Sequence, residues 1–141
     1  MFYLKENEFS VLIQIVTNLI AIVILCIVFF WRGSDEFEIN VLDVGQGDGV
    51  HISTEEGVNY FIDGGSLDVN KVGEYRILPF LKSKGVSKID YWFVSHLDED
   101  HISGLVEIIN LDYKITNIVI SQYIPKDEDY ISLVKLAKEH D

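Results

Sequence analysis

An uninterrupted apolar stretch near the N-terminus places the strongest constraint on this chain. Residues 9–31 read FSVLIQIVTNLIAIVILCIVFFW and contain no charged residue. Such a run is long enough to cross the roughly 30 Å hydrocarbon layer of a membrane as a helix. We therefore predict an N-terminal tail at residues 1–8 and a transmembrane helix at residues 9–31.

A secretory signal peptide is the competing interpretation of the same stretch. It would need a basic segment before the apolar run and a small-residue cleavage site after it. Here Lys5 is offset by Glu6 and Glu8, and the run closes with the bulky residues VFFW. These features favour a retained membrane anchor.

The remainder of the chain has the pattern of a small α/β domain. Residues 32–36, RGSDE, form a polar linker, and residues 37–141 form the domain. The sequence predicts three opening strands, a helix at 72–85, a strand at 88–95 that is apolar enough for burial on both faces, and then a helix, a strand and a last amphipathic helix. The corresponding segments are FEINVLDV, GVHIST, VNYFID, VGEYRILPFLKSKG, KIDYWFVS, HISGLVEIINL, KITNIVIS and DEDYISLVKLAKEH. A run of strands followed by alternating strands and helices indicates a mixed sheet.

The charge of the chain limits its partners. It has 11 basic and 23 acidic residues, for a formal net charge of −12. Such a chain repels the phosphate backbone of nucleic acids, and its basic residues form no run that could act as a binding patch. A nucleic-acid substrate would therefore have to be held by bound cations or by other parts of a larger protein.

Two glycine-bearing loops follow predicted strands. VLDVGQGDG places Gly45, Gly47 and Gly49 after a strand, but the spacing does not match G-x-G-x-x-G and a strand follows instead of a helix. We interpret this loop as a tight turn that needs a positive φ. The second loop, FIDGG, places Asp63 at the end of a strand, which is typical both of site residues and of ordinary turns.

The stretch SHLDEDHISG, residues 95–104, holds two of the four histidines of the chain next to Asp98 and Asp100. Imidazole and carboxylate groups are the ligands that Zn²⁺ and harder divalent cations use. The spacing fits neither H-E-x-x-H nor an EF-hand loop. The alternative is a solvated acidic loop with an aspartate N-cap and incidental histidines. The density of ligand types after an apolar strand favours a metal site.

Three motifs together resemble a known family. SHLDEDHISGL resembles the H-x-[HD]-x-D-H signature of metallo-β-lactamase-fold hydrolases. VLDVGQGDG, YFIDGG and SHLDEDHISGL, in that order, resemble the ComEC-type DNA-internalisation competence proteins. The resemblance implies the first half of a metallo-β-lactamase αββα sandwich, preceded here by one transmembrane helix.

The resemblance also implies roles for individual residues. His96 and Asp98 match ligands of a first metal, and Asp100 and His101 match ligands of a second, with Asp100 also orienting the nucleophile. Asp63 matches the acid that supports the site. One or two Zn²⁺ or Mn²⁺ ions are implied. Asp98, in a position where many relatives have histidine, makes the site harder, so Mn²⁺ is a serious competitor to Zn²⁺.

Four other residues are expected to lie outside the metal site. Asp43 and Asp48 match acids of the opening strand and loop, and we expect them to be structural. His51 and His140 match no family position. We expect His51 to be partly exposed.

The later ligands of the family pattern have no match before Asp141, so we expect a partial domain with one sheet face uncovered and a tendency to self-associate. The favoured function is a single-pass, membrane-anchored hydrolase acting on a phosphodiester or nucleic acid, with its domain on the outer face of the cell membrane. One alternative is a catalytically inactive remnant or binding module with a weak metal site. Another is a membrane protein whose acidic domain binds partners and whose metal motif is incidental.

Overall fold

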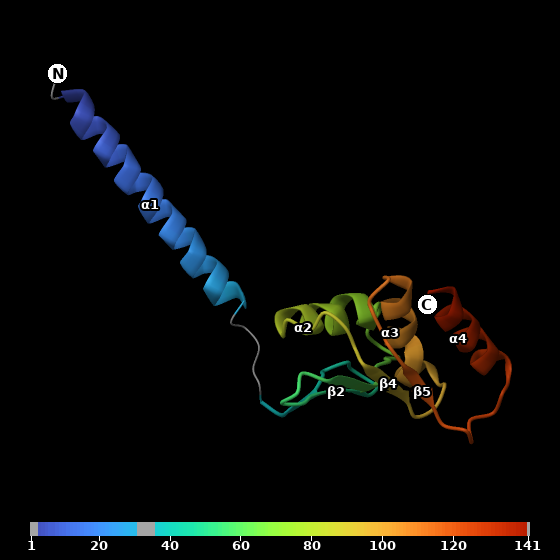
Figure 1. Cartoon of the computed structure of the whole chain (residues 1–141). Helices are drawn as coiled ribbons and strands as arrows, with labels where there is room; N and C mark the ends of the chain where they lie inside the picture. Colours follow the sequence, from blue (N-terminus) through green and yellow to red (C-terminus); the bar gives the residue numbers. More distant parts are fainter. Residues whose placement is uncertain (1–2, 31–35, 141) are drawn as a thin grey trace. The chain divides into compact units, whose positions relative to one another are not determined.

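The computed structural model describes residues 3–30 and 36–140, which fall into two compact units divided between Gly33 and Ser34. The first unit is the helix α1, Tyr3–Phe30 (Figure 1). Within the described residues it is the one helix long and apolar enough to cross a membrane, over Phe9–Val28. Those 20 residues span about 30 Å as a helix. Trp31 and residues 32–35 of the predicted linker lie outside the described residues.

The second unit contains the predicted mixed sheet. Its five strands lie in the order β1-β2-β3-β4-β5, with β1, β2 and β3 antiparallel and β3, β4 and β5 parallel. The strands are β1 Glu38–Val41, β2 Gly49–Ser53, β3 Asn59–Asp63, β4 Tyr91–Val94 and β5 Ile118–Ile120. The expected α/β architecture with a run of strands followed by strand and helix alternation is therefore confirmed.

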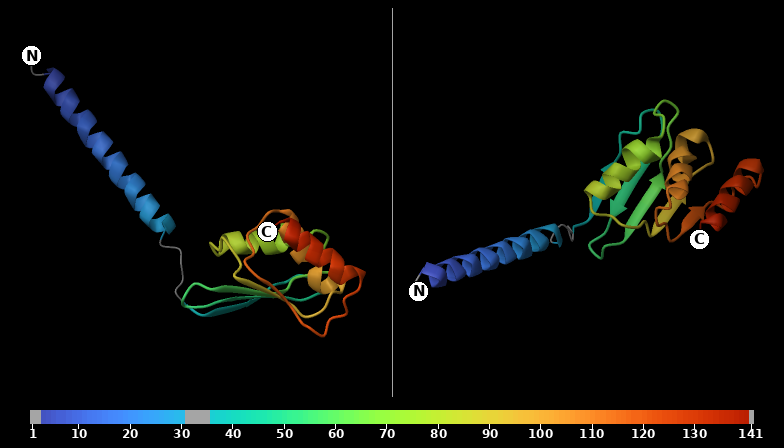
Figure 2. Two further views of the ribbon diagram at one scale, coloured as in Figure 1. Left: turned by 45° about the vertical axis from the view of Figure 1, so that its right-hand side comes forward. Right: turned by 90° about the horizontal axis from the view of Figure 1, so that it is seen from above.

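The helices of this unit lie on one side of the sheet (Figure 2). They are the π-helical turn η1 Gly73–Ile77, α2 Leu78–Ser83, α3 Glu99–Asn110 and α4 Glu128–Glu139. The helix predicted at 72–85 is divided in two: η1 ends where the Leu78 N–H donates to the Gly73 carbonyl, and α2 carries Pro79 in its first turn. The core between sheet and helices is built around Phe61, Trp92 and Leu105.

The opposite side of the sheet is uncovered within residues 36–140. Tyr91 and Phe93 of β4 are 39% and 38% exposed, whereas Trp92 between them is fully buried. The expectation that this strand is buried on both faces is therefore wrong for the described chain. Successive side chains of a strand point to opposite faces, and only one of the two faces has helices against it.

Backbone segments approach each other closely where the loops of the sheet meet α3. A Cβ on Gly104 would collide with the Gly64 carbonyl oxygen, and a Cβ on Gly47 would collide with the carbonyl of Gly65. Of the three glycines in VLDVGQGDG only Gly45 has a positive φ, at 78°. The predicted turn is therefore only part of the explanation, because Gly47 is also needed for close packing.

Candidate metal centre

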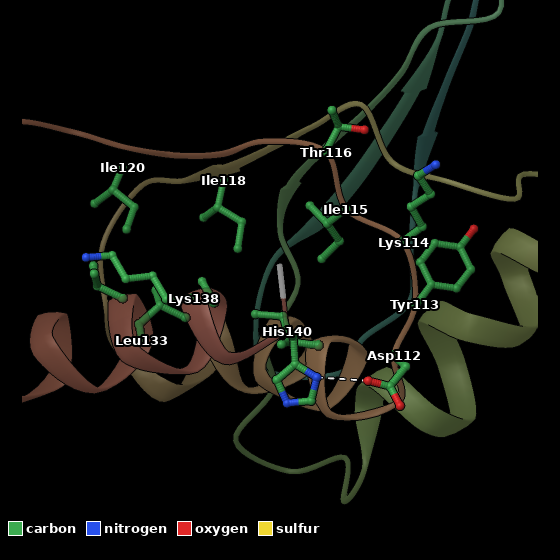
Figure 3. Close-up of a pocket in the computed structure, with 13 residues that line it drawn as sticks. Asp112, Tyr113, Lys114, Ile115, Thr116, Ile118, Ile120, Leu133, Lys138 and His140 are labelled. Atoms are coloured by element: carbon green, nitrogen blue, oxygen red, sulfur yellow. Dashed lines mark hydrogen bonds and ion pairs between the residues drawn. The ribbon is translucent and has the colours of Figure 1, made fainter.

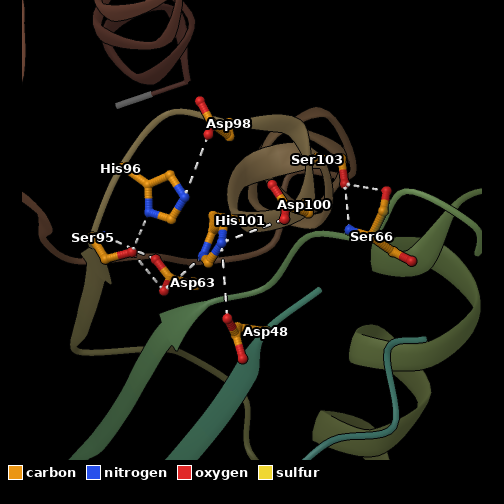
Figure 4. Close-up of polar contacts among 9 residues, drawn as sticks. All are labelled: Asp48, Asp63, Ser66, Ser95, His96, Asp98, Asp100, His101 and Ser103. Atoms are coloured by element: carbon orange, nitrogen blue, oxygen red, sulfur yellow. Dashed lines mark hydrogen bonds and ion pairs between the residues drawn. The ribbon is translucent and has the colours of Figure 1, made fainter. Parts of the chain in front are cut away.

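The predicted ligands lie where β4 ends and α3 begins (Figure 4). His96 follows β4, Asp98 is the N-cap residue of α3, and Asp100 and His101 belong to the first turn of α3. The Asp98 side chain makes no capping hydrogen bond. Its Oδ2 instead lies 3.6 Å from Nε2 of His96.

Three of the four predicted ligands converge closely. One ligand atom from each of His96, Asp100 and His101 lies within 4.8 Å of the other two. Nε2 of His101 is 3.6 Å from Oδ2 of Asp100, and the two imidazole rings are 3.6 Å apart between centroids. Asp98 is outside this group of three and its side chain is 79% exposed.

Asp63 lies behind the histidines and is almost fully buried. Its Oδ1 accepts a hydrogen bond from the Ser95 N–H at 2.8 Å, and its Oδ2 accepts one from the Ser95 hydroxyl at 2.8 Å. Oδ2 is also 3.1 Å from Nδ1 of His101. Because an ionised carboxylate can only accept, this contact puts the proton of neutral His101 on Nδ1 and leaves Nε2 unprotonated, 3.6 Å from Oδ2 of Asp100.

The backbone of Asp63 has an uncommon conformation. Its φ is 56°, in the left-handed region that non-glycine residues seldom adopt and that aspartate tolerates better than most. The turn that follows, Gly64 and Gly65, passes against the backbone of α3. Local strain of this kind is often found at functional sites, where surrounding contacts maintain it.

Asp48 was expected to be structural, but the structure brings its side chain to the cluster. Its Oδ2 is 3.8 Å from Nε2 of His101, and its carboxylate is 70% exposed. The backbone also joins this loop to the site, since the Asp48 N–H donates to the Asp100 carbonyl at 3.3 Å. The signal that could have found it is the pairing of the second and third strands, in which Gly49 lies opposite Asp63.

Asp43, by contrast, lies away from the cluster. Its carboxylate is 87% exposed, 3.9 Å from Arg76, and accepts a hydrogen bond from the Gly45 N–H at 3.4 Å. His51 is also remote from the cluster, and it is buried, with 1% of its surface exposed. The expectation of a partly exposed His51 is therefore wrong.

A polar brace holds the glycine loop beside the site. The Asp68 carboxylate accepts hydrogen bonds from the Gln46 N–H at 2.8 Å and from the Ser66 hydroxyl at 3.0 Å. These bonds, that from Gln46 first, lower the pKa of Asp68 below its usual value. The Ser66 N–H in turn donates to the Ser103 hydroxyl on α3 at 3.0 Å, which ties the loop to the helix carrying Asp100 and His101.

The donor set fits a divalent cation. Two ligands bound about 2.1 Å from a tetrahedral ion are separated by roughly 3.4 Å, close to the 3.6 Å between Nε2 of His101 and the Asp100 carboxylate. Within the described part of the chain, four aspartates form ion pairs with histidines and with no lysine or arginine, namely Asp48, Asp63, Asp98 and Asp100. The cluster is therefore an acidic site without its own counter-charge, which attracts cations.

A separate groove of about 550 Å³ lies between α4 and β5 (Figure 3). It is lined mainly by apolar side chains, among them Ile118, Ile120 and Leu133. His140 lies at this groove, where its Nδ1 is 2.9 Å from Oδ1 of Asp112. No residue of the histidine cluster lines the groove, so His140 is not a ligand candidate.

Comparison with known proteins supports part of this interpretation. No family model matches the chain. ComE operon protein 3 of Bacillus subtilis (strain 168) is 30% identical to it over 118 residues, which covers 72% of this chain and 15% of that protein. The chain thus spans about 15% of the length of the relative it matches. This similarity supports the resemblance to competence proteins, whereas the metallo-β-lactamase fold and the metal ligands stay predictions.

Proposed function

We propose that residues 37–141 form part of a metal-dependent hydrolase of the metallo-β-lactamase fold, anchored by α1 in the cell membrane. The observation that carries the proposal is the convergence of His96, Asp100 and His101 at one edge of the sheet, with Asp63 buried behind them. Asp98 and the unpredicted Asp48 add carboxylates on either side of the histidines.

The substrate we propose is a phosphodiester, with nucleic acid taken up by the cell as the natural example. The similarity to ComE operon protein 3 and the three ordered motifs support this class. A chain of net charge −12 repels a polyanion, so the cations bound at the cluster would also be needed for substrate binding. Contact with incoming DNA places the domain on the outer face of the membrane in this proposal.

A bound Zn²⁺ or Mn²⁺ would supply the Lewis acidity that lowers the pKa of a water molecule and offsets charge on the phosphate oxygens. The residues of the chain would do the rest. His96 and His101 would bind through Nε2, and Asp98 and Asp100 through their carboxylates. Asp100 would also accept a proton from the attacking water and orient it, while Asp63 holds the His101 imidazole in place.

The test is metal content of the full chain in detergent micelles, measured by mass spectrometry after dialysis against Zn²⁺ or Mn²⁺. We expect one or two ions per chain, and loss of these ions in the His96→Ala/His101→Ala double variant. His140→Ala is the matched control, because it removes a histidine outside the cluster. A parent protein without stoichiometric metal, or a double variant that keeps it, would contradict the proposal.

A second candidate is a binding module that holds a cation without hydrolysing substrate. The observation in its favour is that ligand atoms of only three residues come within 4.8 Å of one another in the described part of the chain. A simple phosphodiester such as bis(p-nitrophenyl) phosphate separates the candidates. Metal binding with hydrolysis that is lost in Asp100→Asn supports the enzyme, and metal binding without hydrolysis supports the module.

A further inference from the structure

The Ser95 hydroxyl lies between the buried acid of the site and the first predicted ligand. Its oxygen is 2.8 Å from Oδ2 of Asp63 and 2.9 Å from Nδ1 of His96 (Figure 4). Ser95 was not among the residues that the sequence indicated. It is the last residue before the H-x-D-x-D-H motif. Serine is also common at the end of a strand, so its presence at this position gives no functional signal in the sequence.

The direction of these hydrogen bonds follows from what each group can donate. The Asp63 carboxylate can only accept, so the single hydroxyl proton of Ser95 goes to Asp63 Oδ2. The Ser95 oxygen then has lone pairs left and accepts the contact from His96 Nδ1. A neutral His96 must therefore carry its proton on Nδ1, which leaves Nε2 unprotonated and 3.6 Å from the Asp98 carboxylate.

We propose that Ser95 is a positioning residue that relays the charge of Asp63 to His96 and fixes the His96 proton on Nδ1. One buried carboxylate thereby sets both imidazoles, His101 directly and His96 through the hydroxyl. Each Nε2 lone pair then faces a carboxylate with no hydrogen between them, an arrangement that a bridging cation stabilises. The statement about the proton concerns the metal-free protein, and only its consequence for metal binding rests on the proposed function.

The test is the tautomer of His96 in the metal-free full chain, read from long-range ¹H–¹⁵N correlation spectra in detergent micelles in mildly alkaline buffer. We expect Nδ1–H for both His96 and His101 in the parent. Ser95→Ala should convert His96 largely to Nε2–H, the tautomer that an unconstrained histidine side chain prefers, and leave His101 unchanged. Ser95→Thr keeps a hydroxyl at an exposed position and should restore Nδ1–H.

Ser103→Ala is the matched control, because it removes a nearby hydroxyl that bonds the Ser66 N–H and not a histidine. It should leave the His96 tautomer as in the parent. Nε2–H or a doubly protonated His96 in the parent, or Nδ1–H that survives Ser95→Ala, would overturn the proposal. Amide spectra of each variant verify that the fold is kept.

Metal titration of the same variants separates this inference from the proposed function. Loss of a hydrogen bond behind a ligand typically weakens metal binding about 10- to 100-fold. We expect that loss of Mn²⁺ or Zn²⁺ affinity in Ser95→Ala and near-parental affinity in Ser95→Thr. Equal affinity in the parent and Ser95→Ala counts against the relay, whereas a parent that binds no metal but shows the expected tautomers counts against the metal site alone.

Discussion

The two faces of the five-stranded sheet differ in what covers them, although the open face is no less apolar than the covered one. The covered face contains a row of paired residues that includes both large buried aromatics, namely Asn40, His51, Phe61, Trp92 and Ile118. The adjacent row on the open face is entirely apolar: Val41, Val50, Ile62, Phe93 and Val119. In an antiparallel sheet with one face in water, apolar residues that point to the core normally alternate along each strand with polar residues that point to the water. Here the residues that point to the open face are apolar as well.

The open face also has its own aromatic packing. Tyr60 and Tyr91 lie stacked with ring centroids 5.5 Å apart, and Phe93 is 6.3 Å from Tyr60. On a chain of net charge −12, an apolar surface without charged residues is typical of a surface that packs against another protein segment or molecule. The contrast between the faces teaches that helix cover, and not strand composition, decides which residues of this sheet form its core.

The largest expected effect comes from neighbours in β4 that point to opposite faces. Trp92→Ala removes a fully buried indole whose Nε1–H donates to the Asp63 carbonyl, and we expect a loss of about 3–5 kcal/mol in the free energy of unfolding. Phe93→Ala should cost only about 1 kcal/mol, because that ring is already partly exposed. Urea unfolding of the full chain in dilute micelles measures both. Equal losses would mean that the open face is covered in solution.

A smaller effect is expected from charges placed on the open face. The chain should self-associate through this face, and Tyr91→Lys/Phe93→Lys should raise the dissociation constant at least about tenfold, or about 1.4 kcal/mol. Ser83→Lys on the exposed side of α2 is the matched control and should have no effect. Sedimentation equilibrium in density-matched detergent gives the constants. A parent protein that stays monomeric at every concentration would contradict this expectation.

Much of the fold could be predicted because its signals are local. The alternation in GVHIST and VNYFID and the spacing of apolar residues after Asp98 are properties of short windows, and both the strands and α3 form there. The elements begin or end a few residues from their predicted limits. The strand predicted as KITNIVIS is regular only over Ile118–Ile120. Earlier in the same segment, Ile115 pairs with Ile89 only as an isolated bridge.

The site could be predicted only in part, because some of its contacts depend on strand pairing. Asp63, His96, Asp98, Asp100 and His101 lie in motifs that can be recognised along the sequence. Asp48 reaches these residues because β2 pairs with β3, and Ser95 reaches them because β4 lies parallel to β3. No short stretch of sequence specifies these strand pairings. The burial of His51 was missed for the same reason: its strand alternates as expected, but which face the helices cover is a property of the assembled sheet.

The smallest expected effect concerns His51 on the covered face. Its Nε2 lies 3.1 Å from the Asn59 side-chain oxygen, and its Nδ1 is buried and has no hydrogen-bond partner among the described residues. Burial beside Phe61 and Phe80 lowers the pKa of His51, because desolvation disfavours the charged ring. The unfolded chain therefore binds the His51 proton more readily than the folded one, and stability falls as the pH drops below the unfolded pKa of about 6.5 towards the lower folded pKa.

The measurement is the free energy of unfolding as a function of pH, in which one such group contributes a slope of at most about 1.4 kcal/mol per pH unit. His51→Phe keeps a ring of similar shape in this aromatic setting and removes the titration, so its curve should be flatter between the two pKa values of His51 than that of the parent. Tyr123→Phe is the control, because it changes an exposed ring and leaves all the histidines in place, and it should keep the parental slope. The four carboxyl groups with lowered pKa, Glu38, Asp68, Glu74 and Asp90, are present in both the parent and His51→Phe, so the loss of their stabilising effect at acidic pH contributes to both curves. Parallel curves for the parent and His51→Phe would show that His51 becomes protonated without cost, and the covered face would then be more accessible to water than its packing indicates.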